Sequence, residues 1–517
     1  MRIERTKNAS RNIAVGMVQK VYQILVPFAV RTVMIYILGM EYLGLNSLFT
    51  SILQVLNLAE LGVGSAMVFS MYRPIAQDDH DVICALLNLY RRYYRVIGLV
   101  ILAVGVLLTP AVPYLISGGV PAGMNVYVLY LLNLGATVLS YWLFAYKNSL
   151  LTAYQRTDVI SKVTIIVNTF LLVAQIGVLL IWRDYYIYLL VTLFSQVLQN
   201  VLTAAAADRL FPRYQPKGQL ERAKVQQINR RVRDLVTSKI GEVIVNSADS
   251  IVISASLGLS VLAVYNSYYY ILTSVVGFVM IVLNACMAGI GNSLVVESEE
   301  KNYGDFCKFT FILAWIVGFG SCCLLCLYQP FMTLWIGEEY LLPFGCVMCF
   351  VVYFYVRQIN QLSILYKDAA GMWHEDRFRP LCTALTNLAL NLLLVQKTGL
   401  YGVLLSTVLS VLLVGFPWVT RNLFAVVFKR TAGSYLKNLL YYGMVTLTIC
   451  AATYGVCCLA DFGAVGDLVY RAAVCICLPN LLYLLIFRRR QEWRETLALA
   501  DTVLGGRLKR LGFRKNK

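Results

Sequence analysis

The feature that most constrains this chain is a series of long apolar runs separated by short polar connectors. Each run is roughly 18 to 35 residues long, which suits an α-helix that crosses the hydrocarbon core of a bilayer. We place fourteen runs, at 12–38, 42–71, 96–118, 125–151, 160–182, 185–208, 236–258, 261–295, 307–328, 341–366, 380–397, 400–426, 435–459 and 466–487. The sequence therefore predicts an all-α integral membrane protein with about fourteen transmembrane helices.

The composition excludes the soluble alternatives. Apolar residues make up 59% of the 517 residues and charged residues only 14%, whereas soluble domains carry about 25% charged residues. A water-soluble fold of this size has too little interior to bury so much apolar surface. A soluble enzyme, a disordered chain and a disulfide scaffold are excluded, and the first run is interpreted as a retained helix because no small-residue cleavage site follows it.

The positive charges predict the orientation. Of the 45 Lys and Arg residues, 39 lie in the N-terminal tail, in alternate connectors and in the C-terminal tail. The opposite connectors hold two, Arg183 and Lys397, and the remaining four lie within runs: Lys20, Arg31, Arg357 and Arg471. By the positive-inside rule both termini are cytoplasmic, in a multi-pass protein of the cell membrane. The net charge of +18 then reflects topology and the anionic inner leaflet, and gives no reason to expect nucleic acid.

Internal similarity predicts two related halves. Residues 38–45 (LGMEYLGL) resemble residues 257–264 (LGLSVLAV), and the segments GVGSA at 62–66 and GIGNS at 289–293 end the second and eighth runs. The predicted organisation is an N-lobe of six spans at 1–210, a basic cytoplasmic connector at 211–235, a C-lobe of six spans at 236–430, an extra hairpin at 431–487 and a basic amphipathic cytoplasmic tail at 488–517. The GxG segments are interpreted as close helix packing because no phosphate-loop context surrounds them.

Polar residues within the runs are the candidate functional residues, since they are costly in lipid unless they face a cavity or a partner. Helical spacing places Lys20, Gln23 and Arg31 on one face of the first span. The candidates for substrate binding in a hydrated cavity are Arg31, Arg357, Lys20, Lys239, Gln23, Asn57, Asn246, Tyr355, Gln358, Asn360 and Gln361, and those for ion coupling are Glu60, Glu242 and Asp249.

Several of these residues have a second interpretation. Lys20 and Lys239 lie near the inner interface, where they line a cavity or snorkel to the headgroups. Glu60 binds a coupling ion or pairs with a basic neighbour for packing alone. Pro27 and Pro417 are expected to bend their helices.

The cysteines and histidines predict no metal and no cofactor. Most of the 14 Cys lie in apolar runs, where a free thiol behaves as a small apolar side chain. The pairs Cys323/Cys326 and Cys346/Cys349 have CxxC spacing but no nearby His or second pair in the sequence. His80 and His374 both lie in charged connectors, where solvated side chains are expected.

Four stretches carry a family resemblance. AELGVGSAMV at 59–68, SADSIVISASLGLSVLAVYNSYY at 247–269, LYKDAAGMWHEDRFRPL at 365–381 and TNLALNLLLVQKTGLYGVLLSTVLS at 386–410 resemble Wzx-type polysaccharide flippases. These belong to the multidrug/oligosaccharidyl-lipid/polysaccharide (MOP) exporter superfamily. The resemblance covers the first twelve spans and implies two six-helix lobes, alternating access, and an undecaprenyl-pyrophosphate-linked oligosaccharide as cargo, moved from the inner to the outer leaflet.

Under this interpretation Arg31, Arg357 and either Lys20 or Lys239 meet the pyrophosphate, and Tyr, Asn and Gln meet the sugars. The protein is then a transporter, not an enzyme. A polysaccharide polymerase and other assembly proteins are compatible partners. Two alternatives stay open: a cation-coupled antiporter of the multidrug-and-toxin-extrusion type, and a membrane glycosyltransferase or polymerase. The short outer connectors disfavour the second.

Overall fold

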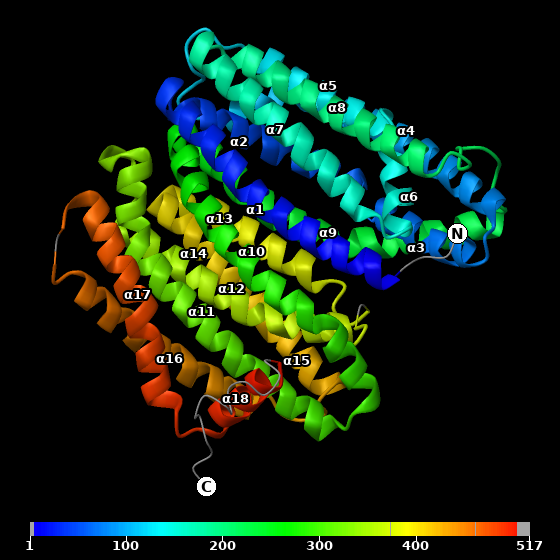
Figure 1. Cartoon of the computed structure of the whole chain (residues 1–517). Helices are drawn as coiled ribbons and strands as arrows, with labels where there is room; N and C mark the ends of the chain where they lie inside the picture. The colour runs from blue at the N-terminus through cyan, green and yellow to red at the C-terminus, as the bar shows by residue number, and fades with distance from the viewer. Residues whose placement is uncertain (1–4, 61, 373, 461, 504–517) are drawn as a thin grey trace. The chain divides into compact units, whose positions relative to one another are not determined.

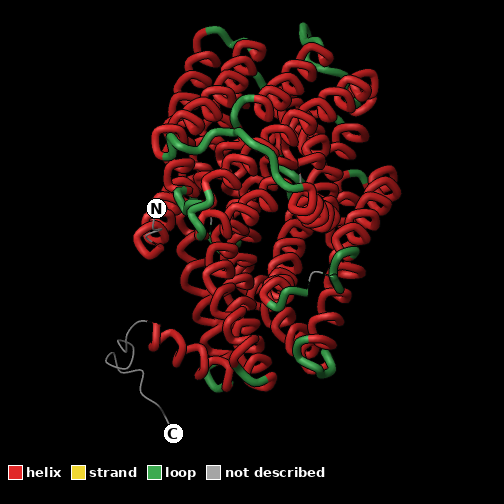
Figure 2. Tube along the Cα trace, turned by 90° about the vertical axis from the view of Figure 1, so that its right-hand side faces the viewer, coloured by secondary structure: helices red, strands yellow, loops and turns green. Residues whose placement is uncertain are grey.

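The computed structural model describes residues 5–60, 62–372, 374–460 and 462–503, and these form helices and short connections without a strand (Figure 2). The predicted all-α, multi-span membrane fold is confirmed. Each of the fourteen predicted runs coincides with one helix or with a helix that is interrupted. The helices divide between two compact units, and each is described separately.

The first unit runs to Asn266 and takes in Asn391–Gly399. Figure 1 labels its helices, which are coloured from blue to green. They are α1 (Arg5–Ile37), α2 (Met40–Leu56), α3 (Val63–Ala76), α4 (His80–Leu108), α5 (Val126–Trp142), α6 (Asn148–Ala153), α7 (Thr157–Ile181), α8 (Tyr185–Leu210), α9 (Arg222–Leu257) and the start of α10 (Leu259–Val296), with short 3-10 helices at Asn57–Glu60, Thr109–Leu115 and Ala145–Lys147.

The second unit has Ser267–Leu390 and continues from Leu400. Its helices are the rest of α10, α11 (Glu299–Ile336), α12 (Phe344–Ala369), most of α13 (Arg379–Thr398), α14 (Leu400–Ser410), α15 (Phe416–Val426), α16 (Gly433–Cys457), α17 (Gly463–Phe487) and α18 (Gln491–Val503), with a 3-10 turn at Glu338–Tyr340. The unit boundary lies within α10, so the lobe boundary at 211–235 stays a prediction.

Local sequence explains where several helices begin. Asp79 precedes α4 and its side chain accepts a hydrogen bond from the backbone N–H of Val82. Ser298 caps α11 in the same way through the N–H of Lys301. Such short polar side chains satisfy backbone donors that the first turn of a helix leaves unpaired.

Nine helices in the described ranges are long and apolar enough to span a membrane, or ten if the bent pair Val126–Trp142 and Ala145–Ala153 forms one span. Helices that do not meet these length and composition criteria include α2, α9, α12 and α13. Each of these carries polar residues within its predicted span. We therefore expect the polar faces of these helices to be directed at protein or water instead of lipid.

Three predicted continuous spans are interrupted. The run at 42–71 breaks into α2, a 3-10 turn at Asn57–Glu60 and α3, with Gly62 in the left-handed conformation (φ 86°). The run at 125–151 bends by 48° after α5, where Phe144 has a positive φ. In the run at 400–426 a π-helical segment, Val411–Gly415, separates α14 from α15, and Pro417 lies in the first turn of α15.

The internal repeat has a backbone counterpart within the first unit. Gly39 connects α1 to α2 with φ 103° and ψ 172°, and Gly258 connects α9 to α10 with φ 94° and ψ 174°. This region of backbone space is open essentially to glycine. Two positions 219 residues apart thus make the same turn, as the aligned sequences suggested.

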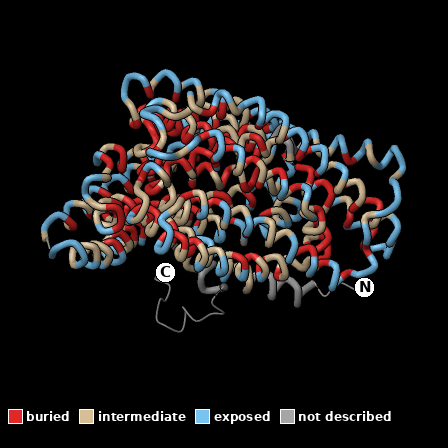
Figure 3. The backbone as a smooth tube through the Cα atoms, turned by 90° about the horizontal axis from the view of Figure 1, so that it is seen from above, coloured by how far each residue is buried: buried red, intermediate tan, exposed pale blue. Residues whose placement is uncertain are grey.

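Burial follows the pattern of a membrane protein. Figure 3 shows buried segments inside the helix packing and exposed segments on outward helix faces. Large apolar side chains are exposed along long helices, among them Leu107, Val173, Leu393 and Leu440. Exposed leucine and valine of this kind are compatible with contact to lipid tails.

Candidate functional site

Glu60 is held by tyrosine hydroxyls in the first unit. It ends the 3-10 turn that interrupts the predicted second span, and it is half-buried. Its Oε1 accepts a hydrogen bond from the hydroxyl of Tyr94 at 2.5 Å, and its Oε2 accepts one from Tyr141 at 2.8 Å. In the described structure, the hydrogen-bond donors to Glu60 are therefore uncharged hydroxyls. One of the two interpretations from the sequence expected a basic neighbour instead.

The tyrosines around Glu60 form a buried chain. Tyr90 donates to the hydroxyl of Tyr94 at 2.6 Å, one turn away on α4. Tyr90, Tyr94 and Tyr141 are 3%, 5% and 7% exposed. A Cβ added to Gly64 at the start of α3 would meet the Tyr90 hydroxyl at 3.0 Å, so this glycine provides close packing, as the GxG segment predicted. Within the described structure, the Glu60 carboxylate is therefore held by hydroxyl groups from α4 and α5.

The first-span candidates lie on α1. Lys20 and Gln23 are exposed, and Arg31 is half-buried. The Nη1 of Arg31 lies 3.5 Å from the backbone oxygen of Asn266, and its charge lies close to the phenol of Tyr188 on α8. Arg31 is thus held within the first unit, whereas Lys20 and Gln23 extend from its surface.

Arg357 is the in-span candidate cation of α12 in the second unit. It lies at the middle of α12, about 20 Å along the helix axis from either end. Its Nη1 donates to the hydroxyl of Tyr353 at 2.8 Å and to that of Tyr269 on α10 at 3.3 Å. The guanidinium also lies over the Tyr353 ring, 5.6 Å from its centroid. Because these hydrogen bonds use one nitrogen of a group with five N–H donors, Arg357 keeps donors for an anion.

The other α12 candidates point in several directions. Gln358 and Asn360 are 1% and 6% exposed, and the Gln358 Nε2 and Asn360 Oδ1 have no hydrogen-bond partner in the described structure. Tyr355 lies against α16, where a Cβ on Gly443 would be 3.9 Å from its hydroxyl. Gln361 is half-buried. In the first unit, the buried Oδ1 of Asn57 also has no hydrogen-bond partner in the described structure.

Asp249 is a buried carboxylate of the first unit. It is 6% exposed on α9. Its Oδ1 accepts a hydrogen bond from Asn391 at 2.6 Å and its Oδ2 accepts one from Tyr265 at 3.3 Å. The remaining α9 candidates, Lys239, Glu242 and Asn246, have side chains outside the described part of the structure, so the stripe expected on this helix stays a prediction.

Polar clusters also stabilise two predicted connectors. Asp158, 1% exposed, lies 3.0 Å from Arg156 and 3.7 Å from Lys162. In the second unit Asp376 receives two hydrogen bonds from Arg379, at 2.6 and 2.9 Å, and lies 3.2 Å from Lys367. These acids are paired with bases in the described structure, whereas Glu60 accepts hydrogen bonds from tyrosine hydroxyls, so Asp158 and Asp376 are interpreted as structural.

Sequence reasoning missed the partners of the in-span charges. Tyr90 and Tyr94 were assigned to a connector because the third run was placed at 96–118, whereas α4 begins at His80. Their spacing of four residues is the signal that places two hydroxyls on one helix face. Tyr141, Tyr265, Tyr269 and Asn391 come from other helices, and no local pattern links them to the charges they contact.

Comparison with known proteins shows the fold. No family model matches the chain, and no curated protein matches its sequence. Among solved structures, it is similar to the lipid II flippase MurJ in an inward closed conformation, with a TM-score of 0.66 at 13% identity over 92% of this chain and 99% of that one. It is also similar to an inward-facing MATE-family multidrug resistance transporter of the MOP superfamily, with a TM-score of 0.64 at 14% identity over 81% of this chain and 98% of that one.

A third structure is a MOP-superfamily transporter from Pyrococcus furiosus described as having a binding pocket of reversed polarity. Its TM-score is 0.52 at 15% identity, over 82% of this chain and 97% of that one. The chain therefore has the fold of MOP-superfamily transporters. None of these structures is specifically a Wzx-type flippase.

Proposed function

We propose that the protein is a flippase that moves undecaprenyl-pyrophosphate-linked oligosaccharides from the inner to the outer leaflet for surface polysaccharide biosynthesis. The observation that carries the proposal is Arg357, a guanidinium at the middle of α12 that donates hydrogen bonds to two tyrosine hydroxyls through one nitrogen. A cation so deep in a span is costly unless it serves a partner that arrives there. A diphosphate is such a partner, since arginine binds it with several parallel hydrogen bonds.

The surroundings of Arg357 suit a sugar head group. The partnerless amide atoms of Gln358 and Asn360 lie one and three residues further along α12. Buried amide groups normally find a partner in protein, water or ligand, and sugar hydroxyls supply both donors and acceptors. The similarity to a lipid II flippase over 92% of the chain supports a lipid-linked cargo.

Transport follows by alternating access of the predicted N-lobe and C-lobe. A sugar-diphosphate cannot cross hydrocarbon because it loses the hydration of its charges and hydroxyls, while its lipid tail can stay in the bilayer. Arg31 is a second candidate for the diphosphate, and Lys20 and Lys239 attract the head group from the inner leaflet. No covalent bond is made or broken.

Glu60 and Asp249 are proposed to couple transport to an ion. Glu60 accepts hydrogen bonds from two tyrosine hydroxyls, and Asp249 accepts hydrogen bonds from a tyrosine hydroxyl and an asparagine amide. In this proposal the two carboxylates bind the coupling ion in one state of the transport cycle and release it in the other.

An antiporter for drugs or metabolites is the second candidate, favoured by the same acids and by the similarity to MATE-family structures. Depletion of the protein in its own cells separates the two functions. The flippase predicts that lipid-linked oligosaccharides accumulate, inaccessible to an external lectin or glycosidase. An unchanged lipid-linked pool would contradict it. Accumulation on the outer leaflet without polymerisation would indicate a polymerase instead.

A further inference from the structure

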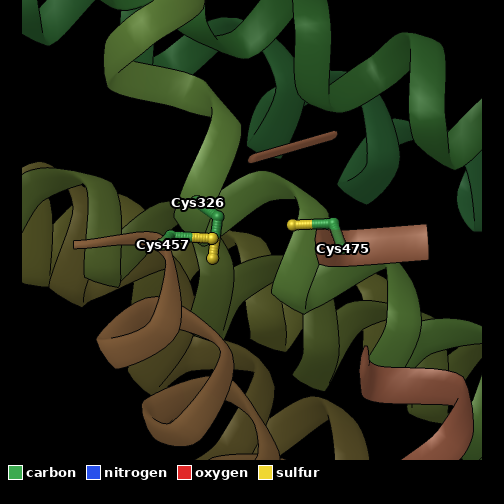
Figure 4. Close-up of side chains that lie close together, drawn as sticks. All are labelled: Cys326, Cys457 and Cys475. Atoms are coloured by element: carbon green, nitrogen blue, oxygen red, sulfur yellow. The ribbon is translucent and has the colours of Figure 1, made fainter. Parts of the chain in front are cut away.

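We propose that Cys326, Cys457 and Cys475 form a three-thiolate binding site for a soft monovalent cation of the Cu(I) class, which joins the C-terminal hairpin α16–α17 to α11. The three sulfur atoms lie within 4.8 Å of one another, and all three residues are 0% exposed (Figure 4). They come from three helices of the second unit, and no sequence spacing brings them together. The sequence interpretation found no further ligand near the CxxC pair Cys323/Cys326. The other two proposed ligands, Cys457 and Cys475, are more than 100 residues away in the sequence.

The geometry fits a metal with three sulfur ligands. A metal–sulfur bond of about 2.3 Å in a planar trigonal arrangement requires sulfur atoms about 4 Å apart. The three sulfur atoms lie within 4.8 Å of one another, which is close to this separation. Figure 4 shows Cys475 on α17 directed toward the sulfur atoms of Cys326 and Cys457 from the opposite side.

The donor set selects the ion. Thiolates are soft ligands that favour Cu(I), zinc and iron–sulfur clusters, and zinc or iron prefers four ligands in a tetrahedron. In the described structure three sulfur atoms satisfy the mutual spacing, and Cys323, Leu327, Tyr454 and Val474 pack against these three cysteines. A trigonal Cu(I) requires no fourth ligand.

More thiols surround the site. Cys322 and Cys450 lie one or two helical turns away on α11 and α16 with their sulfur atoms 3.3 Å apart. The Cys475 thiol also lies 3.9 Å from the backbone oxygen of Cys322. Cys458, which follows Cys457, is exposed at the end of α16.

Binding replaces protons by metal. Each thiol releases its proton to solvent as its sulfur–copper bond forms, and no electrons are exchanged. Arg471 lies one turn before Cys475 on α17, in an ion pair of 2.6 Å with Asp467, and so places a cation next to the anionic site.

The test uses the full-length protein in detergent, reduced, stripped of metal and titrated anaerobically with Cu(I) against a chromophoric chelator. We expect one Cu(I) per chain to be retained, three sulfur ligands in X-ray absorption, and a raised thermal midpoint. The variants C326S, C457S and C475S lose the retained copper at least tenfold. C477S is the matched control because Cys477 lies on α17 two residues from Cys475 but is exposed, and it binds as wild type.

The absorption measurement needs only the wild type, so a variant that fails to fold does not spoil the test. Wild-type protein that retains no Cu(I) overturns the proposal, as does equal retention by a folded triple serine variant. Preferential retention of Zn(II) with four sulfur ligands, or a disulfide between Cys326 and Cys457 that persists when Cu(I) is added, overturns it too. These outcomes are independent of flippase activity.

Discussion

Glu60 in the first unit and Arg357 in the second are held by the same kind of partner although their charges are opposite. Glu60 accepts hydrogen bonds from Tyr94 and Tyr141, and Arg357 donates to Tyr353 and Tyr269. A phenol both donates and accepts, so tyrosine can stabilise either charge within a membrane. In the part of the chain that the structure describes, the hydrogen bonds of both charges go to tyrosine hydroxyls, and we propose that each charge binds an ion or an anionic group during transport.

Two other acids, Asp158 and Asp376, are instead paired with basic side chains. Asp158 and Asp376 are buried beside two bases each. Breaking such a cluster leaves a buried charge uncompensated. We therefore expect these acids to stabilise the fold and not to bind a ligand. The comparison separates charges that hold the fold from charges that are available for transport. The predictions below test that separation.

The largest effect is expected for Arg357→Ala. Loss of charge-assisted hydrogen bonds to a diphosphate, each about 1.5–3 kcal/mol, lowers flipping roughly 10- to 100-fold, and Arg357→Lys restores part of it because lysine lacks the bidentate geometry. The readout is flipping of a fluorescent lipid-diphosphate oligosaccharide in proteoliposomes.

A double variant, Asp467→Asn with Arg471→Gln, is its matched control. It removes another in-span arginine together with its ion-pair partner, so no charge is left unpaired. A wild-type rate is expected. Equal losses in the control and in Arg357→Ala would mean that any in-span arginine is required for folding, not for substrate.

Glu60→Gln is expected to remove ion dependence. The amide keeps the size of the side chain and accepts a hydrogen bond from one tyrosine, but it cannot cycle between proton-bound and free forms. Flipping measured with and without a pH or Na⁺ gradient should lose its response to the gradient, while Asp158→Asn instead lowers the thermal midpoint. If Glu60→Gln keeps the full response, coupling rests elsewhere, and Asp249→Asn is the next variant to measure.

Single hydroxyl deletions should have smaller and opposite effects at the two sites. Tyr141→Phe removes one of the donors to Glu60 and shifts the ion concentration at half-maximal rate. Tyr353→Phe removes one acceptor from Arg357 and changes the substrate concentration at half-maximal rate. Each change is expected to be about 1 kcal/mol, or roughly fivefold. Identical effects of both variants on both constants would contradict a division of labour.

Gly64→Ala should give the smallest effect. Its Cβ would press on the Tyr90 hydroxyl at 3.0 Å, which displaces the start of the tyrosine chain and costs on the order of 1 kcal/mol. Gly135→Ala on α5 is the control because its Cβ would meet nothing within 4 Å. The thermal midpoint of each variant, compared with the wild type, measures the difference.

The membrane fold could be predicted because lipid imposes a length and polarity on every span. The runs at 160–182 and 185–208 coincide with α7 and α8 almost residue for residue. The breaks at Asn57–Glu60 and at Phe144 were missed because a single residue with a positive φ hardly changes the hydropathy of a run. Arg357 was recognised as a candidate because a charge in an apolar run is visible locally.

The partners of these charges depend on tertiary contacts. Tyr141 lies 81 residues from Glu60, and Tyr269 lies 88 residues from Arg357. The same holds for the three thiols, since Cys326, Cys457 and Cys475 lie on separate helices. Hydropathy describes each helix by itself, so it cannot show which side chains meet across helices.

The central claim is that an anionic lipid-linked head group is recognised at Arg357. Its most direct test compares, in proteoliposomes of the wild-type protein, a lipid-diphosphate oligosaccharide with the same oligosaccharide on a neutral linker. The account predicts that the diphosphate probe is flipped at least about tenfold faster, a preference of 1.4 kcal/mol or more, and that Arg357→Ala abolishes this preference. Equal rates for the two probes, or a preference unchanged in Arg357→Ala, would contradict it.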